Sequence, residues 1–589
     1  MNAYSGGLPA EQYKIPFLIG VVGHRNLVDA ELPAIRAALQ DLLERIVRRD
    51  PDARPTLVCS MADGADLLAA DVAASLGIPI LALLPYSRER CRADLANAVE
   101  RELFDRLLKD ADSIELPLPG GMSDRDLEQP GAARDRQFKR AGAIVARYSA
   151  LLIAIWDGRD TDHRAGTARV VEFRRRGLVP TDETVLLPSD ALLSAEDNDL
   201  MYEIRCSRAG DPPGNGGVKV LGFTGAQVQP GEVLPRALTT PLRRFAEFNR
   251  DVADFGARIE KHGRRLSIPS PNPVAQNLHY LDRLFTASDW LGTYYQHCFR
   301  RAVRIRYALW SLMAFLLITF KHEANTGNAA YSIFGVLGVF ALGALFARWA
   351  HRRSWHRKYL DCRALAEGLR VDFYWEIAGV RGEFSGEFAH ESFLQKQDVE
   401  LQWIRDAMRA VSLRLAMAPA TRFEGGFAHA FAAWVGDDDP VNGTGQLHYY
   451  TRRAAAAESK LRISDRVTRV LLMIGMAIAV SFGIDEVAHW LGHPLLRGSV
   501  RELLLWGLAL NTVYAAVLEV YLAEMAERSL VRQYRYMRSL FGVAARALRA
   551  PGSDEHKLEI LRSLGHACLA EHAQWILAHR DKRIEGLRW

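Results

Sequence analysis

Four apolar segments constrain the fold of this 589-residue chain more than any other feature. They occupy residues 307–320, 331–347, 470–484 and 503–518. A helix needs roughly 20 apolar residues to cross a bilayer core about 30 Å thick. These segments are somewhat shorter, so they could instead be buried helices of a soluble core. Their arrangement in two pairs with short connections, with aromatic and basic residues near their ends, favours membrane spans.

Positive charge around these segments is asymmetric. The first connection has Lys321 as its only Lys or Arg, and the second has Arg497 and Arg501. The opposite ends of the segments carry many more basic residues, namely Arg300, Arg301, Arg304, Arg306, Arg348, His351, Arg352, Arg353, Arg357, Lys358, Arg462, Arg466, Arg469, Arg528, Arg532, Arg535 and Arg538. By the positive-inside rule, each pair is a hairpin that enters and leaves from the cytoplasm. The N-terminus, the middle region and the C-terminus are then expected to be cytoplasmic.

Polar residues within or beside the fourth segment suggest a water-filled path. Ionisable or amide groups at membrane depth are costly and usually face protein or water. Asn511 is the best pore-lining candidate, with Glu519 at the inner mouth of the pore. In the alternative interpretation, Glu519 lies at the membrane interface and pairs with a neighbouring arginine.

Composition excludes several classes of protein. Charged residues make up 25% and hydrophobic residues 49% of the chain, which excludes wholesale disorder. The 75 basic and 70 acidic residues leave a net charge of only +5, which argues against a dedicated nucleic-acid binder. The six cysteines are scattered and form no CxxC pair, so a zinc or thioredoxin-like site is not expected. The first residues lack the pattern of a signal peptide, so the N-terminal domain is expected to stay where it is synthesised.

Residues 15–210 alternate short apolar runs with helical stretches. The runs 17–22, 56–59, 78–84 and 148–155 predict strands of a parallel sheet covered on both faces. The alternation predicts a doubly wound, Rossmann-like α/β domain. The proline- and glycine-rich stretch that follows predicts a linker, in which residues 218–225 could add a strand.

Candidate ligand-binding residues follow the ends of these strands, where open α/β sheets bind ligands. They are Gly20, Gly23, His24, Arg25, Ser60, Gly64, Ala65, Asp66, Asp157, Gly158, Gly166 and Thr167. The glycines would admit a phosphate, the helix after Gly64 would attract it, and Arg25 could bind it in a bidentate pair. Asp66 or Asp157 could accept ribose hydroxyls. All of these could instead be ordinary turn residues, with Asp66 favouring its own helix.

The same motifs resemble a known family. Residues 23–25, 60–66, 156–158 and 165–168 are similar, in this order, to motifs of the SLOG superfamily, which includes LOG-type phosphoribohydrolases, DprA and YspA-like proteins. The resemblance covers about residues 15–210 and implies binding of a nucleotide or a nucleotide-derived second messenger, with no further cofactor. It does not extend to catalysis, because the LOG glutamate three residues after Thr167 is replaced by Val170. The nearest glutamate, Glu172, is turned by roughly 200° on a helix. Binding without turnover is therefore expected, and a LOG-like hydrolase is the alternative.

The helical remainder, about residues 275–589, resembles the SLATT family of SLOG-associated transmembrane effectors in bacterial conflict systems. Arg363, Glu367 and Arg370 belong to the most specific part of this similarity. Their spacing also predicts either ion pairs along one helix face or a solvated face. The family is usually described with one membrane pair, whereas this chain has two.

The two resemblances together imply a homo-oligomeric ion channel or membrane-disrupting effector of the bacterial inner membrane, acting in antiviral defence without nucleic acid. A constitutive channel or scaffold is a further alternative. The expected divisions are a tail (1–14), a nucleotide-sensing domain (15–210), a linker (211–240), cytoplasmic helices (241–306), a first transmembrane hairpin (307–347), a cytoplasmic helical domain (348–469), a second hairpin (470–518) and C-terminal cytoplasmic helices (519–589).

Overall fold

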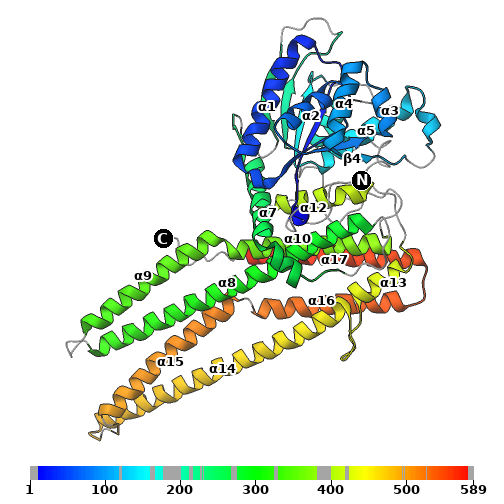
Figure 1. Cartoon of the computed structure of the whole chain (residues 1–589). Coiled ribbons are helices and arrows are strands. Elements are labelled where there is room, and N and C mark those ends of the chain that lie inside the picture. Colours follow the sequence, from blue (N-terminus) through cyan, green and yellow to red (C-terminus); the bar gives the residue numbers. More distant parts are fainter. Residues whose placement is uncertain are drawn as a thin grey trace. The chain divides into compact units, whose positions relative to one another are not determined.

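The computed structural model of the chain (Figure 1) describes residues 11–118, 122–159, 166–176, 200–210, 217–225, 228–229, 231–266, 275–323, 329–380, 399–417, 423–493, 495–496, 498–525 and 527–580. The chain forms two compact units. One comprises Met1–Leu291, Asp361–Ala430 and Asp554–Trp589, and the other comprises Gly292–Leu360 and Phe431–Ser553. Each unit therefore combines segments that are distant in sequence.

The first unit contains a seven-stranded sheet in the order β4-β3-β2-β1-β5-β6-β7. The strands are β1 (Phe17–Gly23), β2 (Pro55–Cys59), β3 (Ile80–Leu84), β4 (Asp112–Glu115), β5 (Leu151–Trp156), β6 (Met201–Arg205) and β7 (Lys219–Thr224). β1 to β6 pair in parallel, and β7 is antiparallel to β6. The predicted Rossmann-like α/β domain is confirmed, and the apolar stretch in the predicted linker forms β7.

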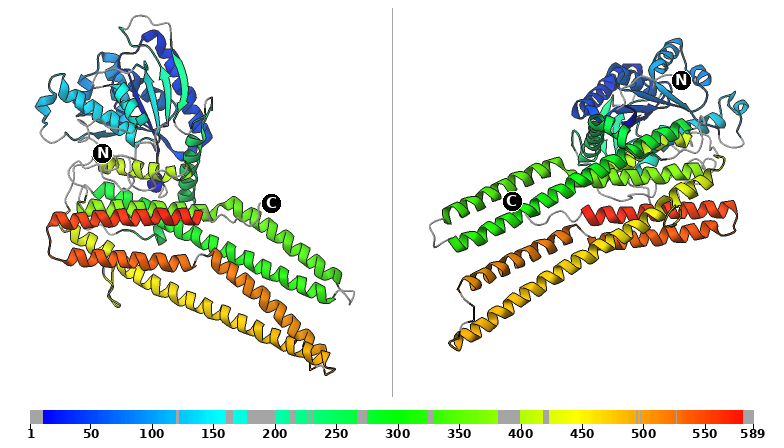
Figure 2. Two further views of the ribbon diagram at one scale, coloured as in Figure 1. Left: turned by 180° about the vertical axis from the view of Figure 1, so that it is seen from behind. Right: turned by 60° about the horizontal axis from the view of Figure 1, so that its bottom comes forward.

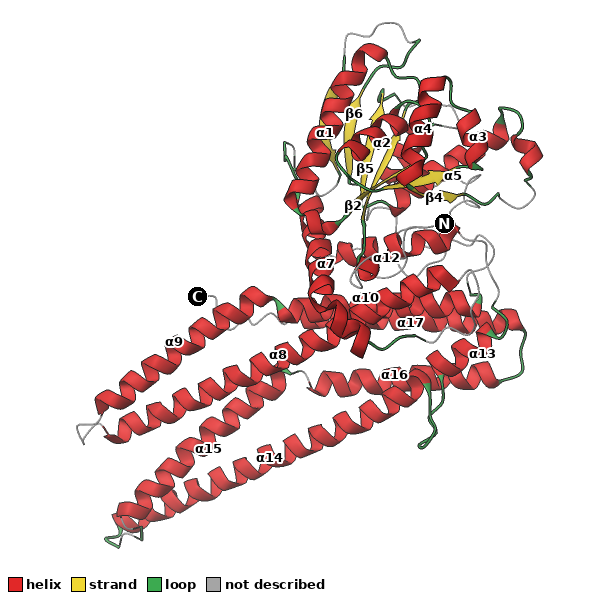
Figure 3. Ribbon diagram, in the orientation of Figure 1, coloured by secondary structure: helices red, strands yellow, loops and turns green. Residues whose placement is uncertain are grey.

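Helices cover the sheet on both faces (Figure 3). They are α1 (Leu32–Arg49), α2 (Ala65–Ser75), α3 (Arg88–Ala93), α4 (Ala98–Asp110), α5 (Ala132–Tyr148) and α6 (Thr167–Arg176). α2 packs against α1, α4 and the first three strands, whereas α5 and α6 pack against each other and against β1. β2, β3 and β5 are buried throughout, as expected for strands covered on both faces.

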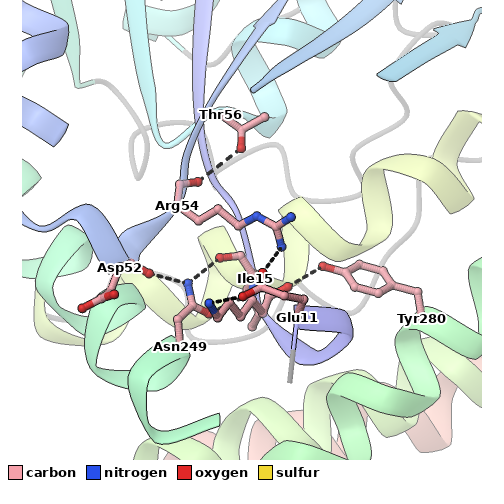
Figure 4. Close-up of polar contacts among 8 residues, drawn as sticks. Glu11, Ile15, Asp52, Arg54, Thr56, Asn249 and Tyr280 are labelled. Atoms are coloured by element: carbon pink, nitrogen blue, oxygen red, sulfur yellow. Dashed lines mark hydrogen bonds and ion pairs between the residues drawn. The ribbon is translucent and has the colours of Figure 1, made fainter. Parts of the chain in front are cut away.

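A polar junction ties the amino end of β1 to helices from later in the chain (Figure 4). Asn249 of α7 (Arg236–His262) is 1% exposed. Its Oδ1 accepts the N–H of Ile15 at 2.9 Å, and its Nδ2 donates to the carbonyl oxygens of Ile15 and Asp52 at 3.0 and 2.8 Å. Tyr280 Oη donates to the carbonyl oxygen of Lys14 at 3.1 Å. Tyr280 belongs to α8, so this helix contacts the residues that lead into the central strand.

Long helices make up the rest of the described chain. They are α8 (Ala275–Glu323), α9 (Ala329–Arg353), α10 (Trp355–Ala378), α12 (Val399–Met417), α13 (Gly426–Ala430), α14 (Gly445–Trp490), α15 (Gly498–Glu524), α16 (Glu527–Arg549) and α17 (Asp554–Arg580). α14 and α15 lie side by side (Figure 2). The 49 residues of α8 rise roughly 73 Å at 1.5 Å per residue.

Among the residues that the structure describes, four helices are long and apolar enough to cross a membrane, within Asn277–Phe320, Tyr331–Ala378, Gly445–Trp490 and Gly498–Arg549. In the most apolar window of each, 11% of the first and none of the other three is buried. The apolar segments are therefore not core helices of a soluble fold, and the chain has the features of a multi-pass membrane protein. The apolar segments are shorter than a membrane span, but each continues into flanking helix, so the helices themselves are long enough.

The charged helix face predicted in α10 is buried rather than solvated. Glu367 and Arg370 are 4% and 7% exposed, and Arg370 donates to Glu367 at 2.5 Å. Arg363 donates to Asp289 of α8 at 3.0 Å. Trp375, Trp403 and Trp434 are also buried.

Candidate functional site

The switch in strand order lies between β1 and β5, because the chain crosses to the other side of β1 after β4. His24 follows β1 and Asp157 follows β5, so both lie at the carboxyl edge of the sheet. The N–H of His24 donates to the carbonyl oxygen of Ile155 at 3.0 Å, and the N–H of Asp157 donates to His24 Nε2 at 3.0 Å. The structure thus joins two of the predicted residues at the position where such sheets bind ligands.

Asp157 is a buried carboxylate at this switch point. Its Oδ1 lies 3.2 Å from His24 Nε2, and its side chain is 8% exposed. His24 Nε2 thus lies close to both the N–H and the carboxylate of Asp157. Burial acts to raise the pKa of Asp157, but the Arg159 N–H, His24 and Arg208 outweigh it and lower this pKa. The group is therefore an anion at neutral pH.

Arg25 is an exposed cation beside this pair. Its guanidinium carbon lies 3.9 Å from the centre of the Phe138 ring, and its Nε lies 3.5 Å from Asp63 Oδ1. The side chain remains 43% exposed. An arginine stacked on an aromatic ring keeps its planar fork available for a phosphate or carboxylate.

The loop from β2 to α2 is built around Gly64. Its φ is +73°, and a Cβ there would lie 2.1 Å from the carbonyl oxygen of Arg25, so only glycine fits. The N–H of Ala65 donates to the carbonyl oxygen of His24 at 3.1 Å. The first N–H of α2 is therefore occupied by the chain itself. This contact holds the loop next to His24 and Arg25.

Asp66 supports the same loop. It is 6% exposed and accepts the N–H groups of Ser60 and Ala62 at 3.1 and 3.4 Å. Burial outweighs these hydrogen bonds and raises the pKa of Asp66 to about 7. The alternative in which Asp66 stabilises its own loop and helix accounts for these contacts without a ligand.

Packing accounts for two of the predicted glycines. A Cβ on Gly20 would lie 2.5 Å from Ser149 Oγ, and a Cβ on Gly23 would lie 2.3 Å from the Cβ of Ala65. The two glycines are three residues apart in one strand, so they face opposite sides of the sheet. They allow α5 and α2 to approach β1 closely.

A charged cluster missed from the sequence fixes the position of Gly158. Glu203 in β6 accepts Nε1–H of Trp156 at 3.2 Å and contacts guanidinium nitrogens of Arg175 and Arg205 at 2.5 and 3.0 Å. Burial acts to raise the pKa of Glu203, but these donors lower it overall. A Cβ on Gly158, whose φ is +80°, would lie 1.1 Å from an Arg205 nitrogen. The alternation of Glu203 and Arg205 in one strand, which places both on one face, was the available signal.

Gly166 and Thr167 lie at the start of α6. Residues 160–165, which connect them to Arg159, are outside the described residues. Val170 packs where Gly142 leaves room, and Glu172 accepts a hydrogen bond from Arg169 at 2.9 Å within the helix. Glu172 is therefore engaged on its own helix, as its shifted position predicts.

Comparisons with protein-family models, curated proteins and solved structures found no match for this chain. Its function must therefore be inferred from the geometry. Across the described ranges, no group of three or more His, Cys, Asp or Glu side chains is arranged to hold a metal ion.

Asn511 connects two of the membrane-capable helices. Its Nδ2 donates to the carbonyl oxygen of Leu471 at 2.9 Å, and a Cβ on Gly475 would lie 2.8 Å from the same nitrogen. Such an interhelix hydrogen bond accounts for an amide within an apolar segment. Its role as a pore-lining residue stays a prediction.

The two glutamates at the end of α15 differ in their surroundings. Glu524 contacts Arg306 and accepts the hydroxyl of Tyr307 at 2.6 Å, which joins α15 to α8. Glu519 is exposed, and no ion pair or hydrogen bond involves it in the described part of the chain. The neighbouring arginine expected in the alternative interpretation is thus not provided by these residues.

Proposed function

We propose that this protein is a multi-pass membrane effector of bacterial anti-phage defence. Its N-terminal α/β domain binds a nucleotide-derived signal, and binding triggers pore formation or membrane disruption. The observation that carries the proposal is the helix α8. It includes Tyr280, which is bonded to the residue before Ile15 and β1, and it continues into the first apolar window.

The switch-point residues support binding of a phosphorylated nucleotide. Arg25 offers an exposed guanidinium for phosphate. The adjacent residue, His24, contacts Asp157 and so holds its carboxylate near Arg25. Asp157 is then the group that accepts ribose hydroxyls. Arg205 and Arg208 add positive charge at this edge, beside Glu203 and Asp157 respectively.

For the membrane region we propose two hairpins, with both termini in the cytoplasm of the bacterial inner membrane. Exposed arginines at one end of the four helices and the exposed apolar faces support this arrangement. An impermeant maleimide added to intact cells should label Trp490→Cys and not Val441→Cys. Both parent side chains are highly exposed, at 85% and 84%, so accessibility in the protein itself is matched. Labelling of Val441→Cys alone would reverse the proposed orientation.

The energy required of the signal is substantial. Moving a two-state equilibrium from 1:99 to 99:1 requires roughly 5.5 kcal/mol of differential binding. In an oligomer, several ligands bind one assembly, so the differential binding free energy required of each ligand is smaller.

The hydrolase alternative has less support. Its catalytic glutamate would have to be Glu172, which is 35% exposed and paired with Arg169 on its own helix. A hydrolase would release free base steadily from an added nucleotide, whereas the proposed effector would bind it without turnover.

The deciding experiment is mass spectrometry of the small molecules that remain on the purified full-length protein, followed by leakage of a dye from vesicles containing it. We expect a nucleotide-derived molecule that stimulates leakage from wild-type protein. Arg25→Ala should abolish stimulation, and Arg45→Ala, which replaces a partly exposed arginine of α1, should not. A protein that binds no nucleotide, or that leaks equally with and without it, would contradict the proposal.

A further inference from the structure

Glu519 lies on a face of α15 that no other part of the described chain covers. Gly507 and Asn511 face α14, since a Cβ on Gly507 would lie 3.7 Å from Ile478 Cδ1 and Asn511 donates to Leu471. Tyr521 and Glu524 face α8, where the Tyr521 and Tyr307 rings are 5.5 Å apart. At 100° per residue, Glu519 points roughly 80–120° away from the first face and roughly 140–160° away from the second.

Arg466 has the corresponding position on α14. Gly475 and Ile478 face α15, and Arg466 points roughly 120–180° away from them. Glu458 and Asp465 face α16, where they pair with Arg535 and Arg528 at 2.6 and 3.7 Å. Arg466 is roughly 80–100° away from that face. It is exposed, and among the described residues it has no ion pair.

The two charges lie at the same level along the antiparallel helices. Asn511 lies beside Leu471 and Gly475. Eight residues further along α15 is Glu519, and eight residues back along α14 from those two contacts are residues 463 and 467. Arg466 falls within this interval, so the two side chains start within about 5 Å of each other in depth, one helical turn.

The outward faces also differ in side-chain size. Near Glu519, the face of α15 carries Thr512, Ala515 and Ala516. Near Arg466, the face of α14 carries Val470 and Met473, which are 47% and 63% exposed. Small residues allow close approach of a second helix inside a membrane, and larger residues fill the space they leave.

We propose that a second copy of this chain covers these faces, with α15 of one copy packed against α14 of the next and Glu519 paired with Arg466 across the contact. A lone carboxylate on a lipid-facing helix is costly, and this contact removes the cost without any rearrangement within the chain. The two faces are complementary but not identical. The contact is therefore head-to-tail, and its repetition builds a closed ring when the rotation closes. The inference rests on the membrane placement in the proposed function, not on the ligand.

Cysteine crosslinking in native membranes tests the contact. Ala516→Cys and Val470→Cys combined in one full-length chain should form a ladder of intermolecular disulfides on oxidation. Either single variant should form almost none, because a head-to-tail contact never places a residue beside its own copy. Ala516→Cys combined with Leu345→Cys is the matched control, since Leu345 is 67% exposed on α9. A dimer from either single variant, or no ladder from the pair, would overturn the proposal.

Charge exchange tests the ion pair. In the crosslinking background, Glu519→Arg or Arg466→Glu alone should reduce the ladder about tenfold, the effect of a coupling near 1.4 kcal/mol. The double exchange should restore it, and failure to restore it after a loss in the single variants would refute the pairing. Alkaline extraction separates the two proposals. Protein that leaves the membrane would contradict both, whereas integrated protein without the ladder would contradict only this interface.

Discussion

Replacing Asn249 by leucine should loosen the central strand of the sheet. The side chain makes three hydrogen bonds, to both backbone groups of Ile15 and to the carbonyl oxygen of Asp52. Leucine has a similar size and offers none of them, so both backbone groups of the buried Ile15 and the carbonyl oxygen of Asp52 lose their partner. At about 1 kcal/mol net for each hydrogen bond, the loss is about 3 kcal/mol. At an unfolding entropy of about 2.1 cal/mol/K per residue, the melting temperature of this first unit, which has about 400 residues, should fall by about 3–4 °C.

Hydrogen exchange measured by mass spectrometry on the full-length protein gives the local readout. Peptides from β1 and β2 should exchange up to about 100-fold faster, since each 1.4 kcal/mol is a factor of ten. Peptides from α14 should be unchanged, which provides an internal reference. Gln40→Leu is the control, because Gln40 is an exposed amide on α1. Unchanged exchange of β1 in the Asn249 variant would refute the assigned role of this junction.

Three further predictions concern stability. Burial raises the pKa of Asp66 to about 7 from 3.8, so the folded state holds a proton that the unfolded chain releases, and stability should fall as pH rises between these values. Thermal unfolding at pH 5 and pH 8 should show a smaller difference for Asp66→Asn than for wild type. Gly64→Ala, with its Cβ 2.1 Å from a carbonyl oxygen, should cost about 2 kcal/mol or more in denaturant titrations, whereas Gly77→Ala, with φ +70° and open space, should cost less. Glu524→Gln should lower the melting temperature in detergent by a few degrees, about 1 kcal/mol, because it removes the ion pair to Arg306; equal stability would make that pair dispensable.

Apolar runs carried most of the information about the fold. They predicted β1, β2, β3 and β5, because buried parallel strands require continuous apolar side chains. They also indicated the stretch that forms β7, although this strand is antiparallel and more exposed. β4 was missed because it is a short edge strand of sequence Asp-Ser-Ile-Glu, which is mostly exposed. β5 begins at Leu151, three residues later than expected, because α5 extends to Tyr148.

The candidate site could be predicted only in part. Residues next to strand ends are visible in a sequence, so His24, Arg25 and Asp157 were found. The order of strands is a tertiary property, and the cluster of Glu203 and Arg205 at the end of β6 becomes part of the site only through that order. Likewise, packing explains Gly20 and Gly23 only once the neighbouring helices are known.

β1 constrains how a ligand signal can leave the sheet. Its carboxyl end leads to His24, and the residues before its amino end bond to Asn249 and Tyr280. A strand of seven residues spans about 23 Å and, held on both sides by parallel neighbours, is nearly inextensible. A displacement at His24 must therefore move α8 as a rigid body or break the junction. Asn249→Leu distinguishes these cases. If transmission requires an intact junction, the variant loses ligand-stimulated leakage but still binds the nucleotide. If rigid packing alone transmits the displacement, its leakage is unchanged.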